Sequence, residues 1–159
     1  LSPALVVTVM ALLGTFASVL GNEASIRFGR RRLVATAMIL SIGFAAILGF
    51  AGSTGYWLAV FLVIAYGVVV WLDSSSVTAG AAGNAEPARR GATLAVHSTL
   101  GYAGGFVGPL VVGWTLDLAG GMSPMAWGLA FLVVALLMLV ALAAFLMMRP
   151  ANLAADRGG

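Results

Sequence analysis

The chain has 159 residues, of which 62% are hydrophobic and only 8% are charged, and its mean hydropathy is +1.08. About a quarter of the residues of a soluble domain are charged, so this composition excludes an ordinary soluble protein and indicates a membrane protein. The formal net charge of +3 arises without lysine, and the absence of cysteine excludes disulfides and thiolate metal sites.

Five apolar blocks are long enough to cross the hydrocarbon core of a bilayer, which takes about 20 residues as a helix. In chain order they cover residues 3–22, 33–51, 56–77, 91–118 and 125–148. Backbone groups in lipid must find their hydrogen-bond partners within the segment, and helices are the structure that allows this. We therefore predict an all-α fold, a polytopic bundle of five transmembrane helices. It forms a single domain over residues 1–159, with residues 149–159 as a short tail.

The first block starts close to Leu1, with no basic region before it and no small-residue cleavage site at its end, so it does not resemble a signal peptide. Because the sequence opens on leucine, we expect it to begin partway through a longer protein. Small residues recur within the block at steps of three and four and therefore share one helix face: Ala11, Gly14, Ser18 and Gly21. Small residues let helices approach closely in lipid, so we expect this face to contact another helix.

All eight basic residues are arginines, and they fall on one side of the predicted bundle. They are Arg27, Arg30, Arg31 and Arg32 after the first block, Arg89 and Arg90 before the fourth, and Arg149 and Arg157 after the fifth. Arginines in short loops keep their side of a membrane protein in the cytoplasm. This predicts an outer N-terminus, a cytoplasmic C-terminus and a bacterial inner (plasma) membrane location. The same placement argues against a nucleic-acid partner, while Trp57, Trp114 and Trp127 predict an aromatic belt on the opposite side.

The fourth block is the richest in glycine. It contains Gly101, Gly104, Gly105 and Gly108, followed directly by Pro109. Pairs of these glycines are four residues apart, a spacing that lets helix backbones approach closely in lipid. Proline removes one backbone donor and weakens the helix locally. The pattern predicts either close packing alone or a helix that bends during transport.

The connection after the first block contains the run Arg27-Phe28-Gly29-Arg30-Arg31, preceded by Gly21 and Glu23. This run resembles the loop signature of the major facilitator superfamily, which is roughly G-x-x-x-D-R-x-G-R-R. Gly21 stands one residue too far upstream, and the expected aspartate is absent. The segment from Gly104 to Pro109 is similar to the glycine–proline helix of the same family. The order and spacing of the two motifs resemble helices eight to twelve, which implies a partial fold of the C-terminal half.

The resemblance implies a secondary active transporter, in which a small-molecule substrate is moved by alternating access between two halves. The N-terminal half is missing from this chain, so we expect the fragment to be inactive alone. In the family the signature loop latches the cytoplasmic side, which implies a gating role for Gly21, Glu23, Arg27, Gly29, Arg30 and Arg31. Glu23 would then meet the start of the fourth helix at Arg90-Gly91, and Arg27 would pair with Glu86. The alternative is that the arginines only set topology and contact anionic lipid.

Asp73 in the third block and His97 in the fourth are the candidates for carrying a proton. If the third helix continues to about residue 79, both side chains lie ~9 Å from the inner surface and are able to face each other. A buried acid and histidine would then couple transport to protons. The alternative is that Asp73 lies among headgroups and His97 packs with a water. Tyr66, on the third block, is a candidate for lining a cavity.

The sequence holds no arrangement typical of an enzyme. There is one histidine, no cysteine and no pair of acids close in sequence, whereas a hydrolase triad or a metal cluster needs more polar residues than these. We therefore predict no enzymatic activity, no cofactor and no metal. The rival to a transporter is a non-transporting helical scaffold or assembly subunit, and an upstream reading frame encoding further spans would decide between the two.

Overall fold

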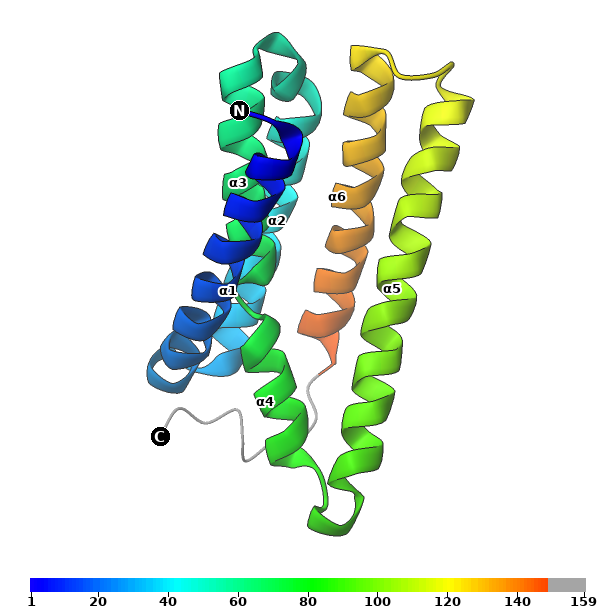
Figure 1. Ribbon diagram of the computed structural model, residues 1–159. Coiled ribbons are helices and arrows are strands. Elements are labelled where there is room, and N and C mark those ends of the chain that lie inside the picture. The colour runs from blue at the N-terminus through cyan, green and yellow to red at the C-terminus, as the bar shows by residue number, and fades with distance from the viewer. Residues whose placement is uncertain (149–159) are drawn as a thin grey trace.

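The computed structural model describes residues 1–148, and this part of the chain is almost entirely helical (Figure 1). The helices are α1 (Pro3–Phe28), α2 (Arg30–Ala51), α3 (Tyr56–Trp71), α4 (Ser74–Asn84), α5 (Arg90–Leu118) and α6 (Pro124–Met147), with short 3-10 turns η1 (Gly52–Thr54) and η2 (Pro87–Arg89). Five spans are long and apolar enough to cross a membrane, with α3 and α4 together forming one of them. The predicted fold class is therefore confirmed, while the tail predicted at 149–159 lies outside the described residues.

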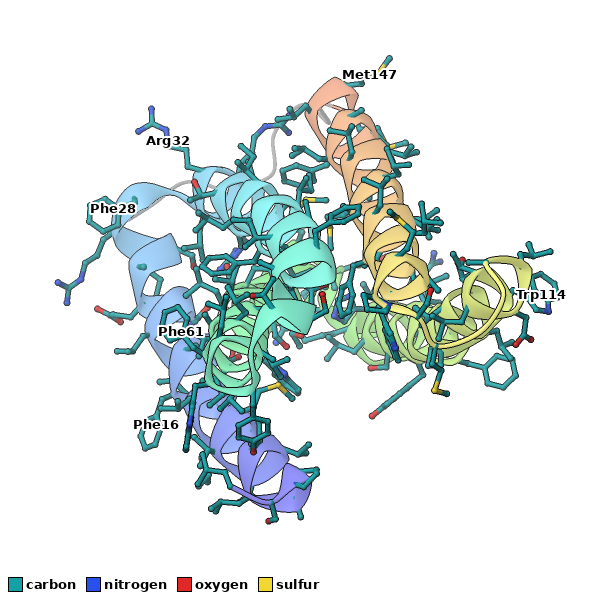
Figure 2. All side chains as sticks on the ribbon, turned by 90° about the horizontal axis from the view of Figure 1, so that it is seen from above. Phe16, Phe28, Arg32, Phe61, Trp114 and Met147 are labelled. Atoms are coloured by element: carbon teal, nitrogen blue, oxygen red, sulfur yellow. The ribbon has the colours of Figure 1, made fainter. Side chains whose placement is uncertain are left out.

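The large apolar side chains point away from the bundle, as they do in a protein whose solvent is lipid. Phe16, Phe61 and Trp114 lie on the outside of the assembly in Figure 2, and each has about two thirds or more of its surface exposed. The buried core is instead made mostly of alanine, glycine, serine and a few larger aliphatic residues. Helices in lipid associate through small residues and close backbone approach. This accounts for small residues inside the bundle and large apolar residues outside it, the reverse of a soluble protein.

Helices α1 and α2 form a hairpin whose only non-helical residue is Gly29. The positive φ of Gly29 (+92°) is a conformation that glycine adopts readily and other residues rarely do, so the chain reverses direction in one residue. The Gly29 amide donates to Ser25 O at 3.0 Å, which closes the end of α1. The basic run expected to be a loop is therefore helical up to Phe28 and again from Arg30.

The span formed by α3 and α4 packs together with α1, α2 and α6, while α5 lies at the side of this group (Figure 1). Helix α1 packs against α3 and α4, and α2 packs along α6. The α2–α6 contact is close at Gly49, where an added Cβ would lie 2.7 Å from Phe131 Cβ and 3.1 Å from the Gly128 carbonyl oxygen. Helix α5 meets α6 at one end, through Leu116, Ala126 and Ala130, and approaches α4 at the other.

The third span is interrupted at Leu72 and Asp73, between α3 and α4. The small-residue face predicted on the first block packs here, although its first member, Ala11, is exposed. An added Cβ at Gly14 would lie 2.9 Å from Trp71 Cδ1, and one at Gly21 would collide with the Leu72 carbonyl oxygen. The small residues of α1 therefore allow it to lie directly against the interruption.

Helix α5 continues through Pro109 without interruption. At Gly101, Gly104, Gly105 and Gly108 an added Cβ would meet nothing within 4 Å among the described residues. The close helix packing predicted for this stripe is therefore absent from the described part of the chain. Toward its C-terminal end, α5 contacts α6 through Leu116. Farther from that contact the two helices diverge and leave an apolar groove of about 350 Å³, which Gly104 and Gly108 line on one side and Met138 on the other.

Candidate functional site

Most charged side chains of the described residues gather at the end of the bundle that carries the arginines, which we call the arginine end. There α1 turns into α2, α4 passes through η2 into α5, and α6 finishes. The tryptophans Trp57, Trp114 and Trp127 lie toward the opposite end, on the first turn or two of α3 and α6 and the last turns of α5. This separation agrees with the distribution of arginine and tryptophan in the sequence.

The ion pairs at the arginine end are local. Arg27 donates from Nε and Nη2 to Glu23 Oε1, at 3.1 and 2.9 Å, one turn back along α1. Glu86 pairs with Arg89 at 3.5 Å. The predicted Arg27–Glu86 pair is therefore wrong, and Glu23 meets Arg27 rather than the start of α5. The reason is that α1 extends beyond the predicted end at residue 22, which places Glu23 and Arg27 four residues apart on one helix face.

Arg31 joins the start of α2 to the end of α6. Its guanidinium donates to the carbonyl oxygens of Phe145, Leu146 and Met148 at 3.0–3.1 Å. The same group lies over the Phe145 ring, 5.0 Å from the ring centroid. The last carbonyls of a helix lack partners within the helix and carry partial negative charge, so a planar cation with several donors fits this position.

Arg30 joins α2 to α4. Its Nε donates to Ser76 Oγ at 3.2 Å, and its side chain crosses Gly80, where an added Cβ would lie 2.8 Å from Arg30 Cδ. Ser76 is fully buried. Arg30 and Arg31 therefore connect the same turn of α2 to two different helices.

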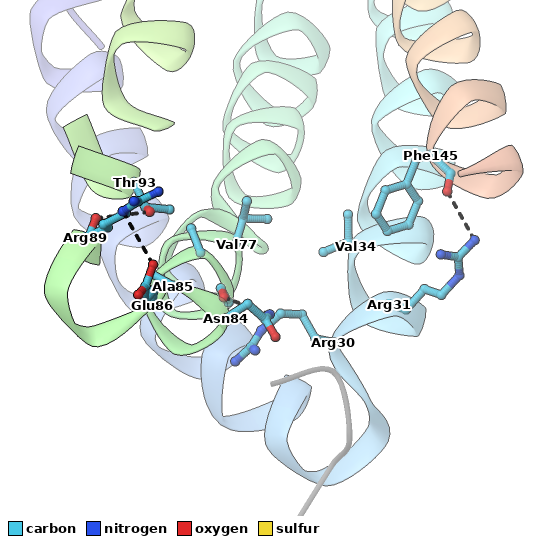
Figure 3. A pocket seen from close by; sticks show the side chains of 12 residues that line it. Arg30, Arg31, Val34, Val77, Asn84, Ala85, Glu86, Arg89, Thr93 and Phe145 are labelled. Atoms are coloured by element: carbon cyan, nitrogen blue, oxygen red, sulfur yellow. Dashed lines mark hydrogen bonds and ion pairs between the residues drawn. The ribbon is translucent and has the colours of Figure 1, made fainter. Parts of the chain in front are cut away.

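A cavity of about 470 Å³ opens between these contacts, which we call the arginine cavity (Figure 3). Arg30, Arg31 and Val34 line it from α2, and Phe145 from α6. The opposite wall comes from the end of α4 and the start of α5: Val77, Gly80, Ala81, Asn84, Ala85, Glu86, Arg89 and Thr93. The described lining contains three arginines and one glutamate, so its net charge is positive.

The interruption between α3 and α4 has its own polar contacts. Asp73 precedes α4, yet its side chain does not cap the helix. Ser18 of α1 does so instead, because its Oγ accepts from the Ser75 amide at 3.1 Å and also contacts Ser75 Oγ. One turn along α1, the buried Oδ1 of Asn22 has no hydrogen-bond partner among the described residues. In the sequence Ser18 stands out only for its small size, and no pattern singles out Asn22.

The structure separates Asp73 and His97, which were expected at equal depth. His97 Nε2 lies 3.2 Å from Thr78 Oγ1 on α4. Helix α4 continues to Asn84 instead of ending near residue 79, so Asp73 lies about 16 Å from its end and Thr78 about 9 Å. His97 lies about 10 Å from the start of α5 and is therefore level with Thr78. Tyr66 is half-buried on α3 and packs edge-on against Phe131, with ring centroids 6.4 Å apart.

Comparison with known proteins gives one family and one curated relative. Residues 2–158 match the family described as Major Facilitator Superfamily. The chain is 30% identical over 131 residues to the "Uncharacterized MFS-type transporter YfnC" of Bacillus subtilis (strain 168). The matched region is 79% of this chain but 30% of the relative, so the chain spans about a third of the relative's length. No solved structure matches the chain significantly.

Proposed function

The chain belongs to the major facilitator superfamily, and from that membership we propose that it forms part of a secondary active transporter that moves a small solute by alternating access. The observation that carries this proposal is the family match over residues 2–158, on a chain with five helices able to span a membrane. We place the arginine end in the cytoplasm and the protein in the inner membrane of a bacterium, because arginine-rich short loops remain on the cytoplasmic side.

In this proposal the five spans correspond to helices eight to twelve, and a seventh helix and the N-terminal half complete the transporter. The length of the relative supports additional helices, because the match covers only 30% of it. The glycine stripe and the apolar groove beside it support the same idea, since they are open to a partner in the described part of the chain. The substrate site of such transporters lies between the halves, so we expect the five-helix segment alone not to transport.

We assign the gate at the cytoplasmic side to the signature run and the residues around it: Gly21, Glu23, Arg27, Gly29, Arg30 and Arg31. Support comes from the contacts of two of them. Arg30 and Arg31 hold α2 against α4 and α6, so a movement of α2 relative to either helix has to break charged hydrogen bonds. Gly29 provides the one-residue turn that places both arginines.

We further propose that Asp73 carries the coupling proton, with His97 in a supporting role through α4. Interrupted helices in transporters place polar groups at ion and substrate sites within the membrane, and Asp73 stands at such an interruption, half-buried. An acid inside a membrane span is costly and therefore marks function more often than structure. The Thr78–His97 contact links the histidine to the helix that follows Asp73.

The test is solute-driven proton movement in proteoliposomes that contain the complete protein and an internal pH-sensitive dye. A panel of small solutes is applied to find one that moves protons, and Asp73→Asn is then compared with the native protein. We expect Asp73→Asn to abolish the proton signal while solute binding is retained. Asp117→Asn is the matched control, because Asp117 is exposed near the opposite end of α5. An Asp73→Asn protein with the native proton signal would refute the coupling role, and a native protein that moves no solute would refute transport itself.

A further inference from the structure

The transport proposal uses Arg30 and Arg31 only for their contacts with α4 and α6 and leaves the arginine cavity between these contacts unassigned. Its volume of about 470 Å³ lies within the ~300–1,000 Å³ that ligand pockets typically have. We propose that this cavity binds a phosphate group carried either by an anionic phospholipid or by a free phosphate ion. None of the cavity's charged groups is assigned to the solute or to the coupling proton, so phosphate binding can be measured without transport.

The donors come from different helices and face one space. Arg30 extends from the start of α2 across Gly80 of α4, and Arg89 stands directly before α5 (Figure 3). Arginine is the side chain best matched to phosphate, because its planar fork offers paired donors to two oxygens. Glu86, already paired with Arg89, is the single acid of the described lining and leaves the cavity with a positive balance.

The start of α5 adds a second, independent preference for an anion. Thr93, in the first turn of this helix of 29 residues, lines the cavity. The helix has no side-chain cap at its N-terminus and no acidic residue in its first turn. The first amides of a helix and its dipole favour a negative group, so α5 presents partial positive charge to the same space as the arginines.

The remaining wall of the cavity is apolar, through Val34, Val77 and Phe145. A lining that combines arginines with apolar side chains suits a phosphate ester whose organic part is hydrophobic. The position also suits a lipid, because α2 starts and α6 ends beside the cavity, at the level where headgroups meet the ends of membrane helices.

The test uses the complete protein, freed of lipid in detergent, with native mass spectrometry to count bound phosphatidylglycerol. Phosphatidylcholine with the same acyl chains measures binding without net charge. The double variant Arg30→Gln with Arg89→Gln removes two arginines of the cavity. The matched control, Arg32→Gln with Arg90→Gln, removes two exposed arginines from the same two segments that do not line it.

We expect the cavity variant to lower the affinity for phosphatidylglycerol about tenfold or more, and the control variant to lower it less than about twofold. An equal loss of affinity for phosphatidylglycerol in both variants would show unspecific attraction by surface charge and would overturn the site. Equal binding of the two lipids by the native protein would overturn it as well. Potassium phosphate added in competition separates the sources: displacement of the lipid assigns the site to phosphate in general, and no displacement assigns it to the lipid. Arg89→Gln alone should weaken phosphatidylglycerol binding severalfold. Because Arg89 is exposed, a loss in this single variant is not explained by misfolding, which controls for the double variant.

Discussion

Gly21 lies directly against the backbone of the interruption between α3 and α4. An added Cβ would collide with the Leu72 carbonyl oxygen, an atom of the main chain that cannot swing aside as a long side chain can. We expect Gly21→Ala to lower the free energy of unfolding by about 1–3 kcal/mol through overpacking, measured by thermal unfolding in detergent. Gly43→Ala is the control, because a Cβ there meets open space on α2. A Gly21→Ala protein as stable as this control would contradict the close contact.

Arg31 is a second residue whose substitution should lower the free energy of unfolding. Removing its guanidinium leaves three carbonyls at the end of α6 without their charged donor, and a hydrogen bond to a charged group contributes about 1.5–3 kcal/mol. We expect Arg31→Gln to destabilise the protein by about that amount. Arg31→Lys should recover only part of it, because an ammonium lacks the planar fork and the stacking on Phe145. Arg32→Gln, at an exposed position, should have little effect in the same thermal assay.

The sequence predicted where the three consecutive arginines lie but not what each one does. The rule that arginines remain on the cytoplasmic side depends on their number in a loop and treats Arg30, Arg31 and Arg32 alike. Once they form the first turn of a helix, successive side chains point in directions about 100° apart. One then reaches α4, one reaches α6 and one remains exposed. This difference depends on the positions of the neighbouring helices, which composition and spacing do not provide.

At the level of whole helices, the interruption between α3 and α4 is the feature that sequence reasoning missed. Residues 70–75 contain no glycine and no proline, so the local sequence has no helix breaker and a continuous span was predicted. The interruption is instead accompanied by contacts from α1, where Ser18 caps the Ser75 amide and Gly21 makes room for the Leu72 carbonyl. A helix end that depends on another helix for its cap is not visible in its own sequence.

Ser18→Ala tests this dependence. The substitution removes the acceptor for the Ser75 amide, and losing a helix cap typically costs about 1 kcal/mol. We expect faster hydrogen–deuterium exchange at the amides of the first turn of α4, by roughly fivefold for a loss of that size. Thr15→Ala is the control, because its hydroxyl donates within α1 to the Ala11 carbonyl and not to α4. Unchanged exchange in α4 would mean that the cap does not hold the helix start.

On the scale of the whole molecule, the number and course of the spans were predictable because lipid imposes them. A block of about 20 apolar residues has few alternatives to a helix, and the five predicted spans are present. Which helices contact each other was harder to predict from the sequence. The glycine stripe of α5 was expected to touch a neighbour, yet α5 contacts α6 near Leu116 and then diverges from it. The stripe is thus a packing surface without a partner in the described residues.

The substitution Gly104→Leu tests what fills the groove beside this stripe in the complete protein. A leucine there enters the space that Gly104 lines opposite Leu137 and Met138. If a helix from the proposed other half lies in the groove, the larger side chain collides with it, and we expect a loss of about 1–3 kcal/mol in thermal unfolding in detergent. If only lipid lies there, leucine replaces acyl-chain contacts and stability should not fall. Ala103→Leu adds a similar side chain at an exposed position about 100° around α5 from Gly104, outside the groove, and should be neutral. Equal stability of both variants would therefore argue that no helix covers the stripe.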